Sequence, residues 1–308
     1  MEYISGDTNF KFHNTAVTLG KFDGIHLGHQ YLMKQVADYK KLGYKTIMFS
    51  FLFHPCNLFS DREIELIYTE EEKRYKLEKS DLDVLISYPF TQETRSMKPE
   101  AFIKDILVDQ LDAKVIVVGS DFHFGYKKRG NIQLLQELQV QYGYKVVVCD
   151  KMKLDDTVIS SSTIRSELQK GNLELVNAML GQPYTIIGEV QHGRKIGRTI
   201  GIPTTNLIPA TNKLLPPCGV YASKTYVDGT YYDGVTNIGF KPTVGAEKRK
   251  GVETYLFDYD NDLYGKLIEV ELFTYERPEM KFNSLEELKY RMQLDITFTQ
   301  KYFKEHNN

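Results

Sequence analysis

The feature that most constrains the fold is a change in the rhythm of apolar residues near residue 182 of this 308-residue chain. Before it, β-prone runs alternate with amphipathic helical segments, a pattern typical of a parallel sheet covered by helices. Beyond it, short β-prone runs are separated by turn signals, which favours a small antiparallel barrel. We therefore expect two domains, residues 1–182 and 183–308, with the boundary at the Gly-Gln-Pro sequence of residues 181–183.

The expected elements of the first domain follow from its apolar runs. Helical spacing of apolar side chains predicts helices over residues 30–42 and 131–142, and Gly43 should end the first of them. Buried strands are expected where β-prone residues run together, at residues 16–19, 45–53, 115–118 and 146–149.

The second domain carries hairpin signals and a closing helix. Asp228-Gly229 lies between β-prone residues, which predicts a tight hairpin, and residues 252–275 read as a second pair of strands around an Asn/Asp/Gly turn. Ser284 and Glu287 form a capping box at the start of the final helix. Its apolar stripe is the set Leu288, Met292 and Ile296.

Composition excludes several classes of protein. Lysine plus arginine number 39 and aspartate plus glutamate 41, so a net charge of −2 argues against a large basic surface for nucleic acid or anionic lipid. No apolar run is long enough for a membrane span, and the N-terminus lacks the pattern of a secretory signal. Cys56, Cys149 and Cys218 form no CxxC pair, so neither a disulfide framework nor a zinc site is expected. We expect a cytoplasmic protein.

The first candidate site is the sequence TLGKFDGIHLGH at residues 18–29, between an expected strand and an expected helix. Its three glycines permit a tight turn and close approach of a ligand, and the start of the helix offers N–H groups to phosphate. Two imidazoles, His26 and His29, are spaced to stabilise charge during phosphoryl or nucleotidyl transfer. The alternative is a glycine-rich turn with two surface histidines.

Two further segments support the phosphate interpretation. Residues 117–130 place glycines and charged residues after a strand, and residues 159–165, ISSSTIR, place hydroxyls and Arg165 at the start of a helix. These serines either cap the helix or, together with the arginine, cradle a phosphate. All three segments follow expected strands, and ligands of open α/β sheets bind at the carboxyl ends of strands.

In this order, GKFDGIHLGH, VGSDFHFG and ISSSTIR resemble the adenylyltransferase module of bacterial bifunctional riboflavin kinase/FAD synthetases, an HxGH nucleotidyltransferase. The resemblance implies a Rossmann-like α/β domain that joins ATP and FMN into FAD and pyrophosphate. It implies phosphate contacts by His26, His29 and Arg165. The same resemblance assigns the nucleotide-binding turn and second phosphate motif to Gly20, Phe22, Asp23, Gly24, Ser160 and Ser161, and flavin contacts to His54 and Asp121.

The second candidate site is HGRKIGRTIGIPTTN at residues 192–206. Gly193 and Gly197 alternate with Arg194 and Arg198, so the loop can bend around phosphates and neutralise them, although it can equally be a solvated hairpin loop. Thr204 and Asn206 offer hard oxygen ligands two residues apart, on one face of a strand, where they could hold Mg²⁺.

Glu253 lies inside the β-prone run VETYLF. It is either a general base or a carboxylate on the wet face of an alternating strand.

The second half resembles the riboflavin kinase module of the same family. The resemblance lies in GRKIGRTIGIPTTNL, GVYAS, GVTNIGFKPTV, VETYLFDYDNDLYGK and RPEMKFNSLEELKYRMQLD. It implies a six-stranded antiparallel β-barrel with a C-terminal helix, which uses ATP and Mg²⁺ to phosphorylate riboflavin. It also implies that Thr204 and Asn206 hold metal and phosphate, that Glu253 is the base, and that Arg277 contacts the flavin.

The sequence therefore predicts a bifunctional enzyme that converts riboflavin to FMN and FMN to FAD, with riboflavin, FMN, FAD and ATP as its partners and no nucleic acid or membrane. Two alternatives stay open. His123 and Thr163 stand where the family usually has arginines, which favours a riboflavin kinase with a weakened adenylyltransferase domain. The other alternative is a flavin-binding regulatory protein that has lost turnover.

Overall fold

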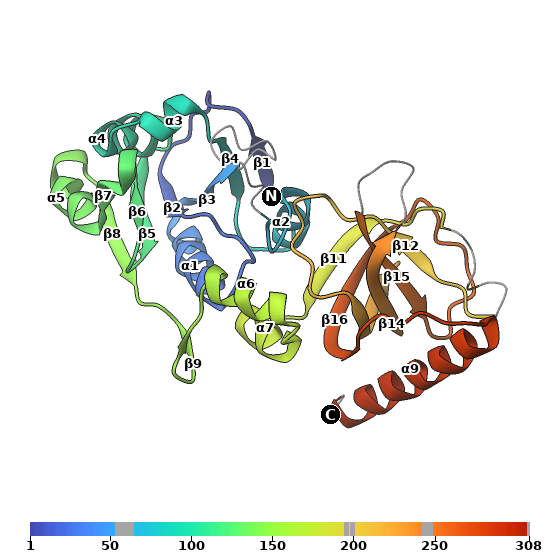
Figure 1. The fold of residues 1–308 in the computed structure, drawn as a ribbon. Helices are drawn as coiled ribbons and strands as arrows, with labels where there is room; N and C mark the ends of the chain where they lie inside the picture. The colour runs from blue at the N-terminus through green and yellow to red at the C-terminus, as the bar shows by residue number, and fades with distance from the viewer. Residues whose placement is uncertain (53–64, 194–196, 198–200, 242–248, 307–308) are drawn as a thin grey trace. The chain divides into compact units, whose positions relative to one another are not determined.

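The computed structural model describes residues 1–52, 65–193, 197, 201–241 and 249–306 (Figure 1). It divides into two compact units, Met1–Ser161 and Ser162–Asn308. The division precedes the boundary expected at residues 182 and 183, because a helix before that boundary, α7 (Leu173–Leu180), packs on strands of the second unit. Asn177 of α7 donates from its side chain to the carbonyl of Leu272 at 2.9 Å. The assignment of residues 162–182 to one domain or the other stays a prediction.

The first unit contains a six-stranded sheet in which every neighbouring pair is parallel. The strand order is β1-β4-β3-β2-β5-β8. The strands are β1 (Glu2–Ser5), β2 (Thr15–Leu19), β3 (Lys45–Leu52), β4 (Val84–Pro89), β5 (Ala113–Gly119) and β8 (Lys145–Cys149). The helices are α1 (Leu27–Ala37), η1 (Asp38–Leu42), α2 (Glu70–Leu77), α3 (Gln92–Ser96), α4 (Pro99–Ala101), the π-helix η2 (Phe102–Gln110), η3 (Tyr126–Lys128) and α5 (Ile132–Tyr142). The short strands are β6 (His123–Phe124), β7 (Gly130–Asn131), β9 (Lys153–Leu154) and β10 (Thr157–Val158).

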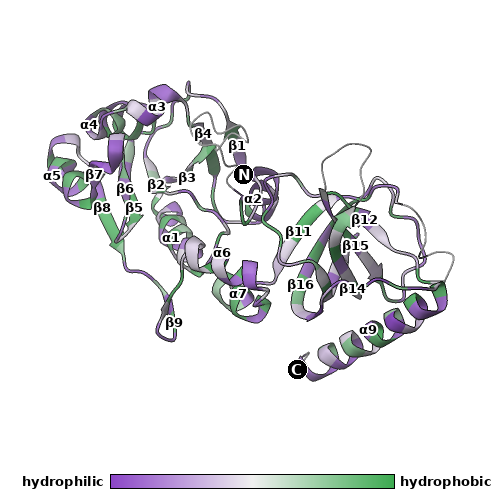
Figure 2. Ribbon diagram, viewed as in Figure 1, coloured by the Kyte–Doolittle hydropathy of each residue, from purple (hydrophilic) through white to green (hydrophobic). Residues whose placement is uncertain are grey.

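Both faces of this sheet are buried, as its apolar strands predicted. On one face Val17, Phe49 and Ile116 pack in a single core with residues of η2 such as Ile103. Helix α1 packs against β2, β3 and β5, and its buried side chains include Leu32 and Val36. Figure 2 shows the resulting concentration of hydrophobic residues in the strands of this sheet.

The expected elements of the first unit are present, with changes at their ends. Helix α1 begins at Leu27 rather than residue 30, because His26 caps it, and it continues as the 3₁₀ segment η1 to Leu42. Gly43 ends that segment at φ +83°, a conformation that glycine adopts without strain. Asn131 caps α5 by accepting a hydrogen bond from the N–H of Leu134 at 3.0 Å.

The second unit is built on a six-stranded antiparallel sheet in the order β11-β16-β13-β14-β15-β12. The strands are β11 (Tyr184–Glu189), β12 (Thr205–Leu207), β13 (Gly219–Val227), β14 (Thr230–Lys241), β15 (Arg249–Leu256) and β16 (Leu267–Arg277). The helices are α6 (Ser161–Lys170, beginning at the division between the units), α7 and α9 (Leu285–His306). The sheet curls so that the chain beyond β11 meets β12, where the N–H of Gln191 donates to the carbonyl of Asn206 at 2.8 Å. The predicted six-stranded barrel is thereby confirmed.

Two local predictions in this unit are tested directly. Asp228 and Gly229, at φ +47° and +91°, connect β13 to β14 as the expected tight hairpin. The hydroxyl of Ser284 accepts from the N–H of Glu287 at 3.1 Å, as a helix cap should. The Glu287 carboxylate, however, accepts from the N–H of Asn283 at 2.8 Å, so the reciprocal half of the capping box is displaced by one residue.

Helix α9 covers part of the curled sheet. Its stripe of Leu288, Met292 and Ile296 packs in one cluster with Phe257 and Ile202. None of the helices in the described part of the chain has the length and apolarity that crossing a bilayer requires.

Candidate active sites

The glycine-rich turn after β2 is held in a strained but well-supported shape. Phe22 and Ile25 both have positive φ, +50° and +44°, and Gly24 between them has φ +86°. Phe22 is fully buried, and its ring meets the ring of His29 edge-on with centroids 5.1 Å apart. The Phe22 side chain therefore supports His29, and a nucleotide would meet only the backbone of this residue.

The two motif histidines form one stacked pair. His26 accepts a hydrogen bond at Nδ1 from the N–H of His29 at 3.3 Å, and the rings stack with centroids 3.6 Å apart and planes 18° apart. A Cβ on Gly28 would lie 3.2 Å from Nδ1 and Cε1 of His26, which explains the glycine between the histidines. His26 is 7% exposed, so the alternative of two surface histidines is wrong for this residue.

Burial keeps both imidazoles neutral. It lowers the pKa of His26 to about 4. The pKa of His29 falls well below its ordinary value because of burial, with added repulsion from His26 and Lys73. Since Nδ1 of neutral His26 accepts a hydrogen bond, its proton is on Nε2, which makes Nε2 a donor. Nδ1 of His29 is buried and has no hydrogen-bond partner among the described residues.

Asp23 connects the turn to two other segments. Its Oδ1 accepts from the N–H groups of Ile67, at 2.9 Å, and Tyr68, at 3.4 Å, just before α2. Its carbonyl accepts from the hydroxyl of Ser161 at 2.9 Å. The structure thus brings the glycine-rich turn and Ser161 of the ISSSTIR segment together, as the carboxyl-end argument predicted for these two segments.

The other residues assigned to the adenylyltransferase site are more dispersed. Asp121 is exposed and pairs with Lys151 at 2.8 Å, while Arg165 is half-buried in α6, one turn after Ser161. Ser160 is half-buried just before α6. His54 lies outside the described residues. The ligand contacts assigned to all these residues stay predictions.

Lys73 is a buried cation that sequence reasoning missed. It lies on α2, only 5% exposed, with Nζ 2.8 Å from Oε2 of Glu70 and donating to Oγ of Ser50 at 3.2 Å. The local sequence EEEKRYKL reads as a solvated charged helix, so the sequence carries no signal of this burial.

In the second unit, two glycines of the candidate loop are required by close contacts. A Cβ on Gly193 would lie 2.3 Å from Nδ2 of Asn206, and one on Gly197 would lie 2.2 Å from the carbonyl oxygen of Ile202. Arg194 and Arg198 lie outside the described residues.

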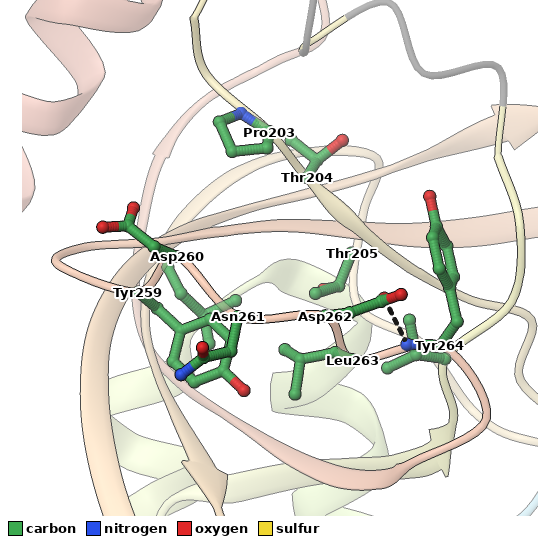
Figure 3. A pocket seen from close by; sticks show the side chains of 11 residues that line it. Pro203, Thr204, Thr205, Tyr259, Asp260, Asn261, Asp262, Leu263 and Tyr264 are labelled. Carbon is green, nitrogen blue, oxygen red and sulfur yellow. Dashed lines mark hydrogen bonds between the residues drawn. The ribbon is translucent and has the colours of Figure 1, made fainter.

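A cavity of about 510 Å³ opens beside this loop. Figure 3 shows Thr204, Asp260, Asp262 and Tyr264 among its walls, and Oδ1 of Asp262 accepts from the N–H of Tyr264 at 3.0 Å. Its remaining lining residues are Val190, Pro203, Thr205, Leu256, Tyr259, Asn261 and Leu263. The ring of His192 packs on that of Tyr264 with centroids 3.8 Å apart. The wall is thus a mixture of apolar, aromatic and hydrogen-bonding groups.

A second cavity, of about 240 Å³, lies between the sheet and the segment that leads into α9. It is lined by Gly197, Thr204, Val220, Val235, Asn237, Glu253, Tyr255, Arg277, Glu279, Met280, Phe282, Leu288, Met292, Asp295 and Ile296. Glu253 is half-buried and lines this cavity, so it is not a carboxylate on the wet face of its strand.

Thr204 lines both cavities of the second unit. Asn206 is 6% exposed and lies opposite Glu253 in the register of β12 and β15, with Asn237 of β14 on the other side of Glu253. The prediction that Thr204 and Asn206 share one face of a strand needs a correction, because β12 begins only at Thr205. Thr204 therefore belongs to the loop, where Pro203 offers no N–H to continue the ladder.

Arg277 is held in the small cavity by a two-point ion pair. Its Nε donates to Oδ1 of Asp295 at 2.9 Å and its Nη2 to Oδ2 at 2.5 Å, and both side chains are largely buried. Such a fork orients the guanidinium rigidly. Its predicted role as a flavin contact stays a prediction.

The described residues contain no cluster of three histidine, cysteine, aspartate or glutamate side chains suited to a metal ion. The oxygens of Thr204, Asn206 and Glu253 are nevertheless hard donors of the kind that Mg²⁺ prefers. Mg²⁺ is commonly held by one or two protein groups together with substrate phosphates, so this donor set fits a nucleotide-borne magnesium ion.

Comparison with known proteins agrees with this division into two sites. The family model for FAD synthetase matches residues 9–163, and the one for riboflavin kinase matches residues 180–303. Bifunctional riboflavin kinase/FMN adenylyltransferases of Buchnera aphidicola and Bacillus subtilis are each 38% identical to the chain. The first comparison covers 100% of both chains, and the second covers 94% of this chain and 92% of its relative.

A solved structure supports the fold. A Streptococcus pneumoniae protein named as a macrolide-efflux protein superposes with a TM-score of 0.83 at 26% identity, over 97% of this chain and 98% of that one. The efflux name belongs to that protein, whereas both enzyme modules are matched in this one. This chain belongs to the bifunctional riboflavin kinase/FMN adenylyltransferase family.

Proposed function

We propose that the second unit phosphorylates riboflavin to FMN with ATP and that the first unit joins FMN to the adenylyl group of a second ATP, which yields FAD and pyrophosphate. The observation that carries the kinase half is that Thr204 lines both cavities of the second unit while Glu253 lines the smaller one. A phosphoryl donor in one cavity and an acceptor alcohol in the other would meet at Thr204.

In this proposal ATP occupies the larger cavity and the flavin ring the smaller. The larger has apolar walls for a base and polar side chains such as Asn261 for its edge. The smaller is walled by Tyr255, Met280 and Phe282, which suit a flat aromatic ring, with Arg277 at its polar side.

Glu253 would then accept the proton of the ribityl 5′-hydroxyl as that oxygen attacks the γ-phosphorus of ATP, and ADP would leave. Thr204 and Asn206 would hold Mg²⁺, whose contribution when bound is to neutralise phosphate charge. Gly193 brings the loop backbone against Asn206 and so fixes that side chain. Gly197, Arg194 and Arg198 would complete the contacts to the phosphates.

In the first unit, a phosphate oxygen of FMN would attack the α-phosphorus of ATP and expel pyrophosphate. Nε2–H of His26 and the backbone of the turn from Gly20 to Gly24 would donate to phosphate oxygens, with Ser160, Ser161 and Arg165 on the leaving group. His54 and Asp121 would contact the flavin. The low pKa of the two histidines matters here, because neutral rings donate hydrogen bonds to phosphate but add no full positive charge.

We further propose a cytoplasmic enzyme whose partners are riboflavin, FMN, FAD and ATP rather than nucleic acid or membrane. This proposal is supported by the net charge of −2 and by the two small-molecule sites.

The test is a product assay with purified protein, ATP and Mg²⁺, starting in parallel from riboflavin and from FMN, with the flavins separated by chromatography. FAD in both reactions is the expected result. FMN from riboflavin with no FAD in either reaction would leave a kinase alone and would direct attention to Thr163 and His123. No turnover of either flavin, with flavin still bound, would favour the regulatory protein.

A further inference from the structure

A buried ion pair on α2 is not explained by the sequence motifs of either module. Glu70 and Lys73, one turn apart on α2, pair at 2.8 Å, with their side chains 20% and 6% exposed. Glu70 also accepts at Oε1 from the hydroxyls of Ser87, on β4, and Tyr3, on β1. Removing two charged groups from water costs free energy, so stability alone does not explain an ion pair in this buried position.

The pair is linked to the glycine-rich turn through one serine. Lys73 donates to Oγ of Ser50 at 3.2 Å, and Ser50 in turn donates to the carbonyl of Lys21 at 3.1 Å. Ser50 is fully buried, so this chain of bonds is shielded from water. Lys21 follows Gly20 directly, so Lys73 fixes the start of the turn that leads to His26.

The ammonium group also acts on the histidine pair electrostatically. Repulsion from Lys73 contributes to the low pKa of His29. Because the histidines are neutral, Lys73 is a buried cation among the described residues of the first unit whose charge acts on His29. A fixed charge in a low-dielectric site needs no reorganisation when negative charge grows on the phosphates.

We propose that Lys73 is a positioning residue for adenylyl transfer: through Ser50 it fixes the glycine-rich turn at Lys21, and its ammonium, held by Glu70, supplies fixed positive charge beside the stacked histidines. This inference rests on the proposed adenylyltransferase function of the first unit. It assigns no direct contact between Lys73 and the substrates.

The experiment compares three substitutions of Lys73 in the full chain. Lys73→Arg keeps the charge, Lys73→Gln keeps a donor without the charge, and Lys73→Met removes both. We expect kcat for FAD formation from FMN to fall about 100-fold in Lys73→Met, because a small misplacement far from the chemistry can cost that much. Arginine should restore more of the rate than glutamine, and KM for ATP should change less than threefold.

Two controls separate positioning from general damage. Riboflavin phosphorylation by the same samples should be unchanged, because Lys73 lies in the other unit. Arg74→Met removes an exposed cation from the same helix, one that pairs with Glu78 at 3.3 Å, and should leave both activities within twofold of wild type. The double variant Glu70→Gln/Lys73→Met avoids a lone buried carboxylate and should stay folded, yet show the same loss of kcat.

Several outcomes would overturn the inference. One is a folded double variant that makes FAD at the wild-type rate. Another is Lys73→Arg that is no better than Lys73→Met. A third is a loss in which KM rises and kcat stays constant. Wild-type protein that forms no FAD from FMN would refute the proposed function itself, so the two failures are distinguishable.

Discussion

Replacing Gly193 with alanine probes the contact that brings the loop of the second unit against Asn206. The new Cβ would lie 2.3 Å from Nδ2, 2.6 Å from Cγ and 2.7 Å from Oδ1 of Asn206. Favourable contacts between such atoms begin at roughly 3.5 Å, so the amide or the loop must move by about 1 Å. Asn206 is 6% exposed and therefore has little open space to move into.

The size of the effect follows from the packing. Inserting a methyl group into a well-packed site costs about 1–3 kcal/mol. If that cost falls on the arrangement needed for phosphoryl transfer, kcat/KM for riboflavin phosphorylation should fall about 5- to 150-fold, at 1.36 kcal/mol for each factor of ten. FAD formation from supplied FMN should be unchanged, because Gly193 is in the other unit.

The assay measures initial rates of FMN formation from riboflavin and of FAD formation from FMN in the same preparations. Gly188→Ala is the matched control, since a Cβ on Gly188 of β11 would meet only the Leu207 side chain, at 3.7 Å and beyond. That variant should stay within twofold of wild type. Full kinase activity in Gly193→Ala, or an equal loss in Gly188→Ala, would show that the contact with Asn206 does not govern the reaction.

Other predictions test the remaining groups. Glu253→Gln should lower FMN formation about 10²- to 10⁴-fold and spare FAD formation from FMN, whereas His29→Ala should do the reverse; loss of both activities in a folded variant would refute separate sites. Because His26 has a pKa of about 4 when folded and an ordinary value near 6.5, the unfolded chain binds a proton first as pH falls. The contribution of His26 to the stability of the first unit should therefore fall by up to about 3 kcal/mol between pH 6.5 and 4, and His26→Asn should make the pH slope shallower in urea titrations followed by hydrogen exchange, the rest of the slope coming from His29, whose pKa is also lowered. Arg277→Met should destabilise the second unit by less than the roughly 3–5 kcal/mol expected for a lone buried charge, because Asp295 keeps an ion pair with Arg291 at 3.0 Å, and Arg277→Met/Arg291→Met, which removes both cations, should cost more than either single change in thermal unfolding.

The sequence predicted what local patterns determine. Periodic apolar runs predicted β2, β3, β5 and β8 with α1 and α5 in the first unit and α9 in the second, and the sequence Asp228-Gly229 predicted the hairpin, because backbone conformation there depends on the residues themselves. The end of α1 was less accurate, since a 3₁₀ continuation differs little from an α-helix in its apolar pattern. Strand β4 and helix α2 were not anticipated.

The sites depended more on partners distant in the chain. Glu253 could be a base or a solvated carboxylate until the register placed it between Asn206 and Asn237 on a cavity wall. The burial of Lys73 could not be predicted for the same reason. It involves contact with Ser50, on strand β3, and a helix of sequence EEEKRYKL has too few apolar residues to indicate a buried face. Register and long-range burial are properties of the folded chain.

Because His26 and His29 are neutral, the first unit must obtain positive charge for the phosphates from other residues. ATP and FMN bring several negative charges, and hydrogen bonds from neutral rings orient phosphates without balancing that charge. The family's usual arginines are absent at His123 and Thr163, so the balance falls on the remaining cations. Lys73, buried on α2, is one such cation, and its charge acts on His29. If Lys73 and Arg165 both contribute to adenylyl transfer as proposed, removing either cation should slow it more than phosphoryl transfer, and a double variant whose loss in free energy equals the sum of the two single losses would show that the two act independently.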